Sequence, residues 1–136
     1  MMEFLLYLTP IGNEIINKMI SKHYVIKENS AICRNKELFG LLQTPDFTIC
    51  LNNIKNTISP VSHYVNETVY HEAVHAIQSC KKGPIGISNI SLDQWKLNDV
   101  MRSANITNQH QVYELEAYYL EDKPELVLEY IEKYCF

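Results

Sequence analysis

The sequence predicts an α+β fold, in which one helix precedes a small sheet and several helices follow it. Apolar residues recur at helical spacing near both ends of the chain, and short apolar runs separated by turn residues lie between these regions. The chain has 136 residues, a length typical of one domain. We therefore expect residues 1–136 to form a single unit.

The individual elements follow from local pattern. Ile11–Ser21 is predicted as the N-terminal helix because apolar residues recur there every three or four positions. A small, mostly antiparallel sheet is predicted from strands at 24–27, 39–42 and 47–51, and a polar connection at 52–62. Further helices are predicted at about 66–82, 92–104, 108–121 and 124–134, with Trp95 in the core.

The charge balance argues against binding to nucleic acid. Lysine and arginine together number 12 against 16 acidic residues, a formal charge of −4, whereas phosphate binding depends on clustered basic side chains. No apolar run is long enough to span a membrane, and the N-terminus lacks the basic residues of a signal peptide. We therefore expect a cytoplasmic protein, and the abundance of Ile, Asn and Lys indicates a bacterial or phage source.

The four cysteines, at positions 33, 50, 80 and 135, include no C-x-x-C pair. Thiols stay reduced in the cytoplasm, so we expect these side chains to be small buried apolar groups rather than disulfides.

The motif that carries chemistry lies on the predicted central helix, as His71-Glu72-Ala73-Val74-His75. Histidines at i and i+4 share a helix face, so their ring nitrogens can bind one metal ion. Glu72 projects to one side, within reach of a zinc-bound water but not of the metal. Zinc makes such a water acidic, and a carboxylate base then produces a nucleophile for a peptide carbonyl. This pattern predicts His71 and His75 as metal ligands and Glu72 as the general base and later proton donor.

A third ligand is expected from a later helix. The metzincin pattern needs a third histidine six residues after the second, where this chain has Lys81. The segment 113–118 offers Glu114 and Glu116 instead. Together with the upstream motif, it resembles the gluzincin metallopeptidases, whose third ligand lies in a pattern of the form E-x-x-A-D or E-x-E-A-D. Aligned on Ala117, the resemblance makes Glu114 the ligand.

The resemblance implies a minimal zincin-like domain that binds one Zn²⁺ and hydrolyses peptide bonds in peptides or proteins. It departs at one position, because the family usually has an aspartate four residues after the ligand to hold a metal-bound histidine, and this chain has Tyr118. Either Tyr118 or another acceptor orients the histidine, or Glu116 is the ligand. Residues 47–52, 67–68 and 71–80 also show a more distant similarity to the mitochondrial inner-membrane assembly metalloproteases.

Two further roles are expected around the motif. His110 and Tyr118 are candidates to stabilise the oxyanion of a tetrahedral intermediate, although a histidine at position 110 equally suits a helix cap or a surface position. The gluzincin resemblance implies a substrate-pairing edge strand beside the active helix, for which an ordinary core strand is the alternative. The residues expected to form this edge strand are Phe47, Thr48, Ile49, Cys50 and Leu51.

Two other interpretations stay open. The site is a structural one if His110, Glu116 or Cys80 supplies a fourth protein ligand, and the chain is then a non-catalytic module that binds a partner. Alternatively, the chain is a helical interaction protein that binds no metal. In the enzyme interpretation, the segment 124–136 is a candidate to lie over the site and restrict access.

Overall fold

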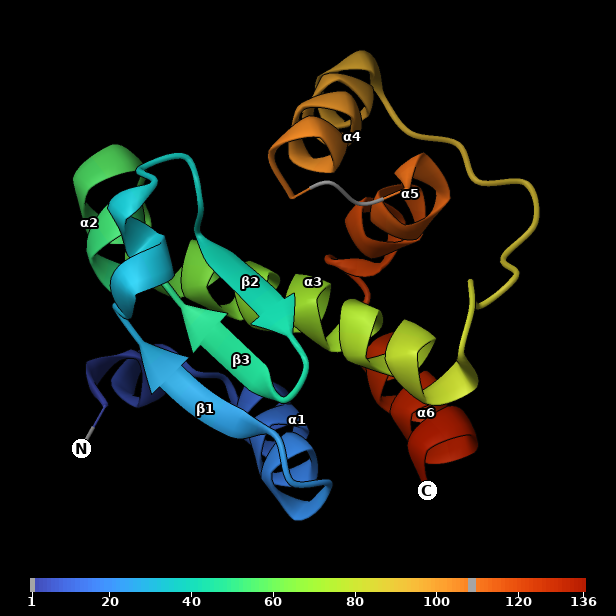
Figure 1. Ribbon diagram of the computed structural model, residues 1–136, viewed down its shortest axis with the longest axis horizontal. Helices are drawn as coiled ribbons and strands as arrows, with labels where there is room; N and C mark the ends of the chain where they lie inside the picture. The colour runs from blue at the N-terminus through green and yellow to red at the C-terminus, as the bar shows by residue number, and fades with distance from the viewer. Residues whose placement is uncertain (1, 108–109) are drawn as a thin grey trace.

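The computed structural model describes residues 2–107 and 110–136 and has the predicted α+β class, with helices around a small mixed sheet (Figure 1). Its elements are η1 (Glu3–Tyr7), α1 (Pro10–Ser21), β1 (Val25–Glu28), η2 (Ala31–Arg34), β2 (Gly40–Gln43), β3 (Asp46–Ile49), α2 (Leu51–Thr57), α3 (Val61–Lys81), α4 (Gln94–Thr107), α5 (Gln111–Leu120) and α6 (Pro124–Cys135). The predicted helices are confirmed, and the region expected to be a polar connection contains the short helix α2. The first residues of the helix predicted at 108–121 lie outside the described part of the chain.

Helix α3 runs through the middle of the molecule and contacts the sheet, the segment η1 and the helices α1, α2, α5 and α6 (Figure 1). One face, which includes Val65, Val69 and Ala73, is fully buried in the apolar core. Because the helix is covered on nearly every side along its centre, His71, Glu72 and His75 are also buried. Polar groups in such a place need partners, and this need shapes the site described below.

The N-terminal helix is tied to α3 by polar contacts. Pro10 opens α1, and the Thr9 hydroxyl caps it by accepting a hydrogen bond from the Gly12 amide at 3.1 Å. Asn66 of α3 accepts from the Thr9 amide at 2.9 Å. The two helices cross so closely that a Cβ on Gly12 would lie 2.6 Å from the Asn66 side chain. This crossing fixes the first half of α3 against the N-terminal region.

The sheet corrects two expectations. Its strand order is β1-β3-β2, with β1 parallel and β2 antiparallel to β3, so the sheet is mixed rather than mostly antiparallel. Strand β3 is central, and the segment expected to be the edge strand continues through Cys50 into α2 at Leu51. The local hairpin of β2 and β3 follows from the turn between them, but β1 joins the other side of β3 only in the tertiary fold. The strand next to α3 with a free edge is β2 (Figure 1).

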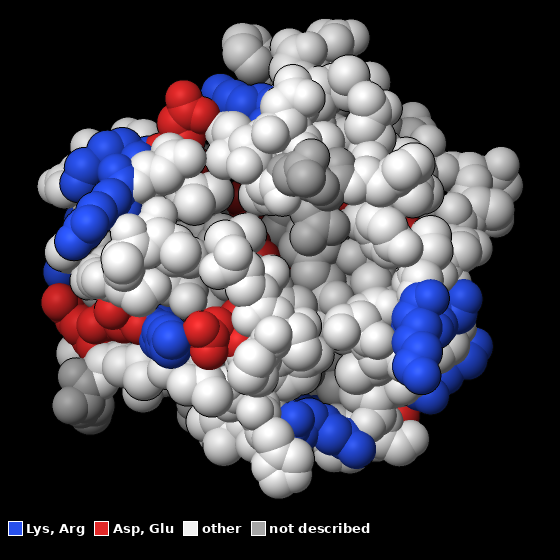
Figure 2. Space-filling view, in the orientation of Figure 1, with Lys and Arg blue, Asp and Glu red and all other residues white. Residues whose placement is uncertain are grey.

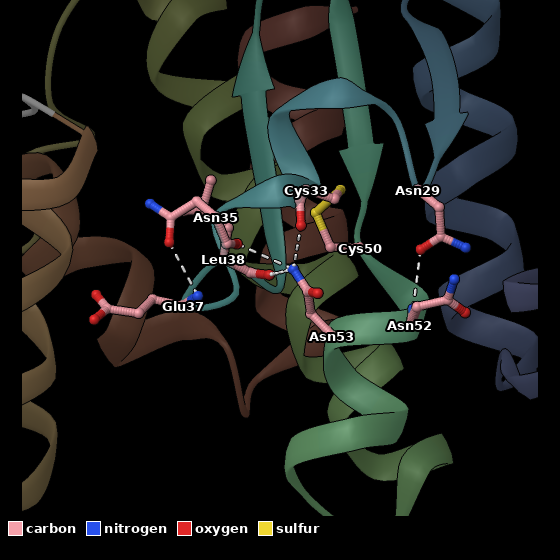
Figure 3. The surroundings of a disulfide bond; sticks show 8 residues. All are labelled: Asn29, Cys33, Asn35, Glu37, Leu38, Cys50, Asn52 and Asn53. Atoms are coloured by element: carbon pink, nitrogen blue, oxygen red, sulfur yellow. Dashed lines mark hydrogen bonds between the residues drawn. A yellow bond between two sulfur atoms is a disulfide. The ribbon is translucent and has the colours of Figure 1, made fainter.

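The loop that leads into β2 is held in place by hydrogen bonds from Asn53 and by a disulfide. Asn53, at the start of α2, donates its carboxamide to the carbonyl oxygens of Cys33, Asn35 and Leu38 at 2.9–3.1 Å. Figure 3 shows these bonds converging beside a disulfide between Cys33 and Cys50. A covalent link and a buried amide therefore position residues 33–38 relative to the sheet.

A second disulfide joins Cys80, at the end of α3, to Cys135, at the end of α6. No free cysteine is found among the described residues, so the expectation of unpaired buried thiols is wrong. The pairs meet because the fold brings together positions 17 and 55 residues apart, a proximity that local sequence spacing does not encode. Paired cysteines are typical of proteins in oxidising compartments, and the cytoplasmic location stays a prediction.

Helix α4 packs mainly on one neighbouring helix and buries few of its own residues. Its principal contacts are with α5, and its buried residues are Val100 and Ala104. Trp95 is 82% exposed, so its predicted place in the core is wrong, because α4 turns only its other face toward the protein. Among the described residues, no helix combines the length and apolarity needed to cross a bilayer.

Candidate metal centre

Three side chains from α3 and α5 converge at the middle of α3. Ring nitrogens of His71 and His75 and a carboxylate oxygen of Glu114 all lie within 4.8 Å of one another. The His71 Nε2 atom is 3.4 Å from Glu114 Oε1, and His75 Nε2 contacts the same oxygen. Ligand atoms of a tetrahedral zinc site lie about 3.4 Å apart, given metal–ligand distances near 2.0–2.1 Å. The group therefore could hold a metal ion.

Each imidazole is oriented through its other nitrogen. His71 Nδ1 lies 2.9 Å from Glu121 Oε1, and His75 Nδ1 lies 2.8 Å from Gln78 Oε1. Such contacts fix the tautomer and leave Nε2 free to bind a metal. Sequence reasoning missed both partners, although spacing carried a signal for each. Glu121 is two helical turns after Glu114, and Gln78 is one turn after His75.

Tyr118 does not take the place of the expected aspartate. Its ring packs edge-on against His71, with centroids 4.5 Å apart, and its hydroxyl contacts Ser103 of α4. The acceptor for the histidine is instead Glu121, at the C-terminal end of α5. This is the second outcome left open by the sequence, in which another acceptor orients the histidine.

Glu116 binds the loop after α3 rather than the two histidines. Its carboxylate accepts hydrogen bonds from the amides of Ile85, Gly86 and Ile87 at 2.8–3.3 Å, and from Gln78 Nε2 at 3.0 Å. These donors satisfy both oxygens and fix the loop after α3. The structure thus brings Glu114, and not Glu116, to the histidines.

Glu72 lies beside the ligand group without being part of it. Its Oε1 atom is buried and has no hydrogen-bond partner within the described residues. The close packing of β2 on α3 depends on Gly40, where a Cβ would lie 2.7 Å from Thr68 Cγ2 and 3.2 Å from Glu72 Cγ. Leaving a buried carboxylate oxygen without a hydrogen bond costs free energy. This oxygen is therefore placed to accept a hydrogen bond from a ligand or a water.

The charges of the metal-free group fit a cation. Burial opposes the charged form of His71, but hydrogen bonds with Glu114 and Glu121 outweigh it and raise the His71 pKa well above 6.5. Burial also opposes ionisation of Glu114, yet its hydrogen bonds with both imidazoles lower its pKa below the usual range. Burial raises the pKa of Glu72 above 4.5. Once the histidines are neutral, the surrounding carboxylates leave an excess of negative charge that a divalent cation would balance.

The ligand group lies in a cleft of about 340 Å³. The loop before β2 and β2 itself form one wall, α4 forms part of the other, and α3 and α5 contribute the ligand group. Figure 2 shows this face, with acidic atoms deep in a hollow near the middle and basic atoms mostly toward the margins. In the described chain no residue of α6 lines the cleft, because α6 packs against α3 and α1. The segment 124–136 therefore does not cover the site as expected.

The two candidates for oxyanion stabilisation differ in position. Tyr118 lines the cleft, and burial raises its pKa above 10, so its hydroxyl stays a neutral donor. His110 is exposed and caps α5, where its Nδ1 accepts from the Val112 amide at 3.3 Å. His110 is thus a helix cap, as in the alternative weighed from sequence. The other possible fourth ligands, Glu116 and Cys80, are bonded elsewhere.

Comparison with known proteins gives a family but no activity. A family model described as "Domain of unknown function (DUF8637)" matches residues 4–136, nearly the whole chain. No curated protein and no solved structure matches the chain.

Proposed function

We propose that this chain, which belongs to the DUF8637 family, is a zinc-dependent metallopeptidase of the gluzincin type. The observation that carries the proposal is a three-residue ligand group, His71, His75 and Glu114, in a cleft. Beside it lies a buried Glu72 oxygen that has no hydrogen-bond partner among the described residues. Three protein ligands leave a coordination position open for water or substrate, as in catalytic rather than structural zinc sites.

The roles of the protein groups follow from their positions. A bound zinc ion would polarise the substrate carbonyl and make water acidic. Glu72 accepts the proton of the attacking water on its free Oε1 and then donates it to the leaving amine. Glu121 and Gln78 keep the two imidazoles in the ligating tautomer. Tyr118 donates its hydroxyl to the developing oxyanion after release from Ser103.

Strand β2 takes over the substrate-pairing role first assigned to residues 47–51. In the antiparallel register with β3, Leu41 lies opposite Thr48, and Phe39 O accepts from Cys50 N at 2.8 Å. Alternation then turns the amides and carbonyls of Gly40 and Leu42 away from β3, toward the cleft. An extended peptide bound along this edge would form main-chain hydrogen bonds beside Glu72.

The test separates zinc binding from hydrolysis. Glu72→Gln is expected to keep a full complement of zinc and to lose hydrolysis of a peptide library by at least about a thousandfold, because the general base is removed. The control is Glu129→Gln on the exposed face of α6, which should change neither property. Equal activity in Glu72→Gln and wild type would refute the proposal. Zinc binding with no hydrolysis by the wild type would favour a non-catalytic metal-binding module.

A further inference from the structure

The cleft does not end at the metal centre. A second, shallower hollow of about 450 Å³ begins at His75 and Leu42, which line both hollows, and continues past Gln78 to Lys82 and Tyr113. The first hollow extends the other way, along α3 to Tyr64. The two hollows together form a groove on both sides of the ligand group, which we call the substrate groove.

The length of the substrate groove can be worked out from α3. From Tyr64 to Lys82 the helix rises about 27 Å, at 1.5 Å per residue. The middle of the HExxH motif lies halfway, about 14 Å from each end. An extended peptide advances about 3.3 Å per residue, so each arm of the groove has room for about four residues. Gly40 and Leu42 of β2 line the first hollow as well.

The two arms differ in charge. The arm toward Tyr64 contains Glu37 and Glu67 in addition to the site residues. Asp99 and Arg102, on the α4 side of this arm, form an ion pair with each other and add no net charge. His63, one turn before Glu67 on α3, places its Nε2 atom 3.5 Å from Glu67 Oε2.

Glu67 also lies next to a second acid, Glu121. Burial and the carboxylate of Glu121 raise the pKa of Glu67 to about 8. At neutral pH Glu67 is therefore mostly protonated, and Lys96, 3.5 Å from Glu121, balances part of the charge of Glu121. A lysine or arginine side chain that enters this arm favours the ionised form of Glu67, so the two acids together favour its binding. The arm beyond His75 instead carries Lys82 as its one charged lining residue apart from the histidine, within the described chain.

We propose that the substrate groove binds an extended segment from the interior of a polypeptide, with a lysine or arginine side chain in the arm that contains Glu37 and Glu67. The chain then acts as an endopeptidase, since about four residues are bound on either side of the cleaved bond. This inference rests on the proposed peptidase function and adds the substrate class.

The experiment uses zinc-loaded protein and a library of decapeptides whose two ends are blocked by acetyl and amide groups, with cleavage sites read by mass spectrometry. The expected result is cleavage at interior bonds, with Lys or Arg enriched within four positions on one side. Blocked peptides should be cleaved as fast as the same peptides with free ends. Removal of only the first or last residue, and only from free peptides, would overturn the inference while leaving the peptidase function intact.

The acidic arm is tested with one pair of peptides that differ by Lys or Gln at the enriched position. We expect the wild type to prefer the lysine peptide about fivefold to tenfold in kcat/KM, and Glu67→Gln to lose most of this preference. The ratio is taken on each variant separately, so a general fall in activity cancels. Lys82→Gln, in the other arm, is the matched control and should keep the preference. A preference unchanged in both Glu67→Gln and Glu37→Gln would contradict the assignment.

Failure of the peptidase function is recognised separately. A fluorescent blocked decapeptide containing lysine is titrated into zinc-loaded Glu72→Gln, and binding is followed by anisotropy. Binding that weakens on Glu67→Gln in this background, with no hydrolysis by the wild type, would refute the function and keep the groove. Binding that is indifferent to peptide charge would refute the groove assignment itself.

Discussion

Replacing Glu121 with glutamine removes the negative charge that orients His71 while keeping an oxygen able to accept its Nδ1 proton. Glu121 Oε1 lies 2.9 Å from His71 Nδ1, and the Glu121 side chain is only 7% exposed, so solvent screens the interaction weakly. Lys96 lies 3.5 Å from the other oxygen of Glu121 and stays in place in the variant. The change therefore tests one carboxylate outside the ligand group.

The expected magnitude follows from the contact that is lost. Loss of a group that orients a metal-ligating histidine typically weakens metal affinity 10- to 100-fold, or about 1.4 to 2.8 kcal/mol. Glu121→Gln keeps a neutral hydrogen bond, so we expect a loss near 10-fold. Glu121→Ala removes the hydrogen bond as well, so we expect a loss near 100-fold.

The assay is competition for zinc against a fluorescent chelator, with thermal unfolding of the metal-free proteins as a check on folding. Asp122→Asn is the matched control, because Asp122 is the next residue along the chain, also lies near Lys96, and does not contact the histidines. Equal zinc affinity in Glu121→Ala and wild type would refute the orienting role of Glu121.

Three further predictions concern the site and the fold. In the metal-free protein the raised pKa of His71 and the lowered pKa of Glu114 stabilise the fold between about pH 4.5 and 6.5, and the histidine contribution is lost as the pH rises through its folded-state pKa. Since zinc needs neutral imidazoles, the rise in Tm caused by zinc should be larger at about pH 8 than at about pH 6 in differential scanning fluorimetry, and a smaller rise would contradict the ligand set. Gly40→Ala should lower the free energy of unfolding in urea by about 1–3 kcal/mol and reduce hydrolysis, because its methyl group would push β2 away from α3. Unchanged stability and activity would show that the packing there is loose. Replacing Cys80 and Cys135 by alanine should cost about 4 kcal/mol for a link that spans 55 positions, whereas free thiols in the purified wild type would show that the pair is not formed.

Much of the site could be predicted because its chemistry is local. His71, Glu72 and His75 are fixed relative to one another by a single helix, so their spacing alone places them correctly. Glu114 needed a second helix and entered through the resemblance to gluzincins. Local pattern could not show which of Glu114 and Glu116 is the ligand. That choice depends on which carboxylate receives hydrogen bonds from the backbone amides of a loop distant in the sequence.

What the sequence could not predict depends on contacts between distant segments. Residues 47–51 do not form the edge strand, because β1 pairs with the side of β3 that β2 leaves open, so β3 is central and β2 lies at the edge. No turn signal between β1 and β3 encodes this pairing. The cysteine pairs depend on the same kind of proximity. Trp95 has the spacing of a core residue, but α4 packs on α5 through its other face and leaves this ring exposed.

The most direct test of the account is the metal content of untagged protein by inductively coupled plasma mass spectrometry. We predict about one zinc ion per chain in the wild type. Zinc should be absent from His71→Ala and Glu114→Ala and retained in Glu116→Ala, whose folding is checked by circular dichroism. A wild type that holds no metal even after zinc is offered would contradict the central claim, and zinc lost from Glu116→Ala but kept by Glu114→Ala would contradict the ligand assignment.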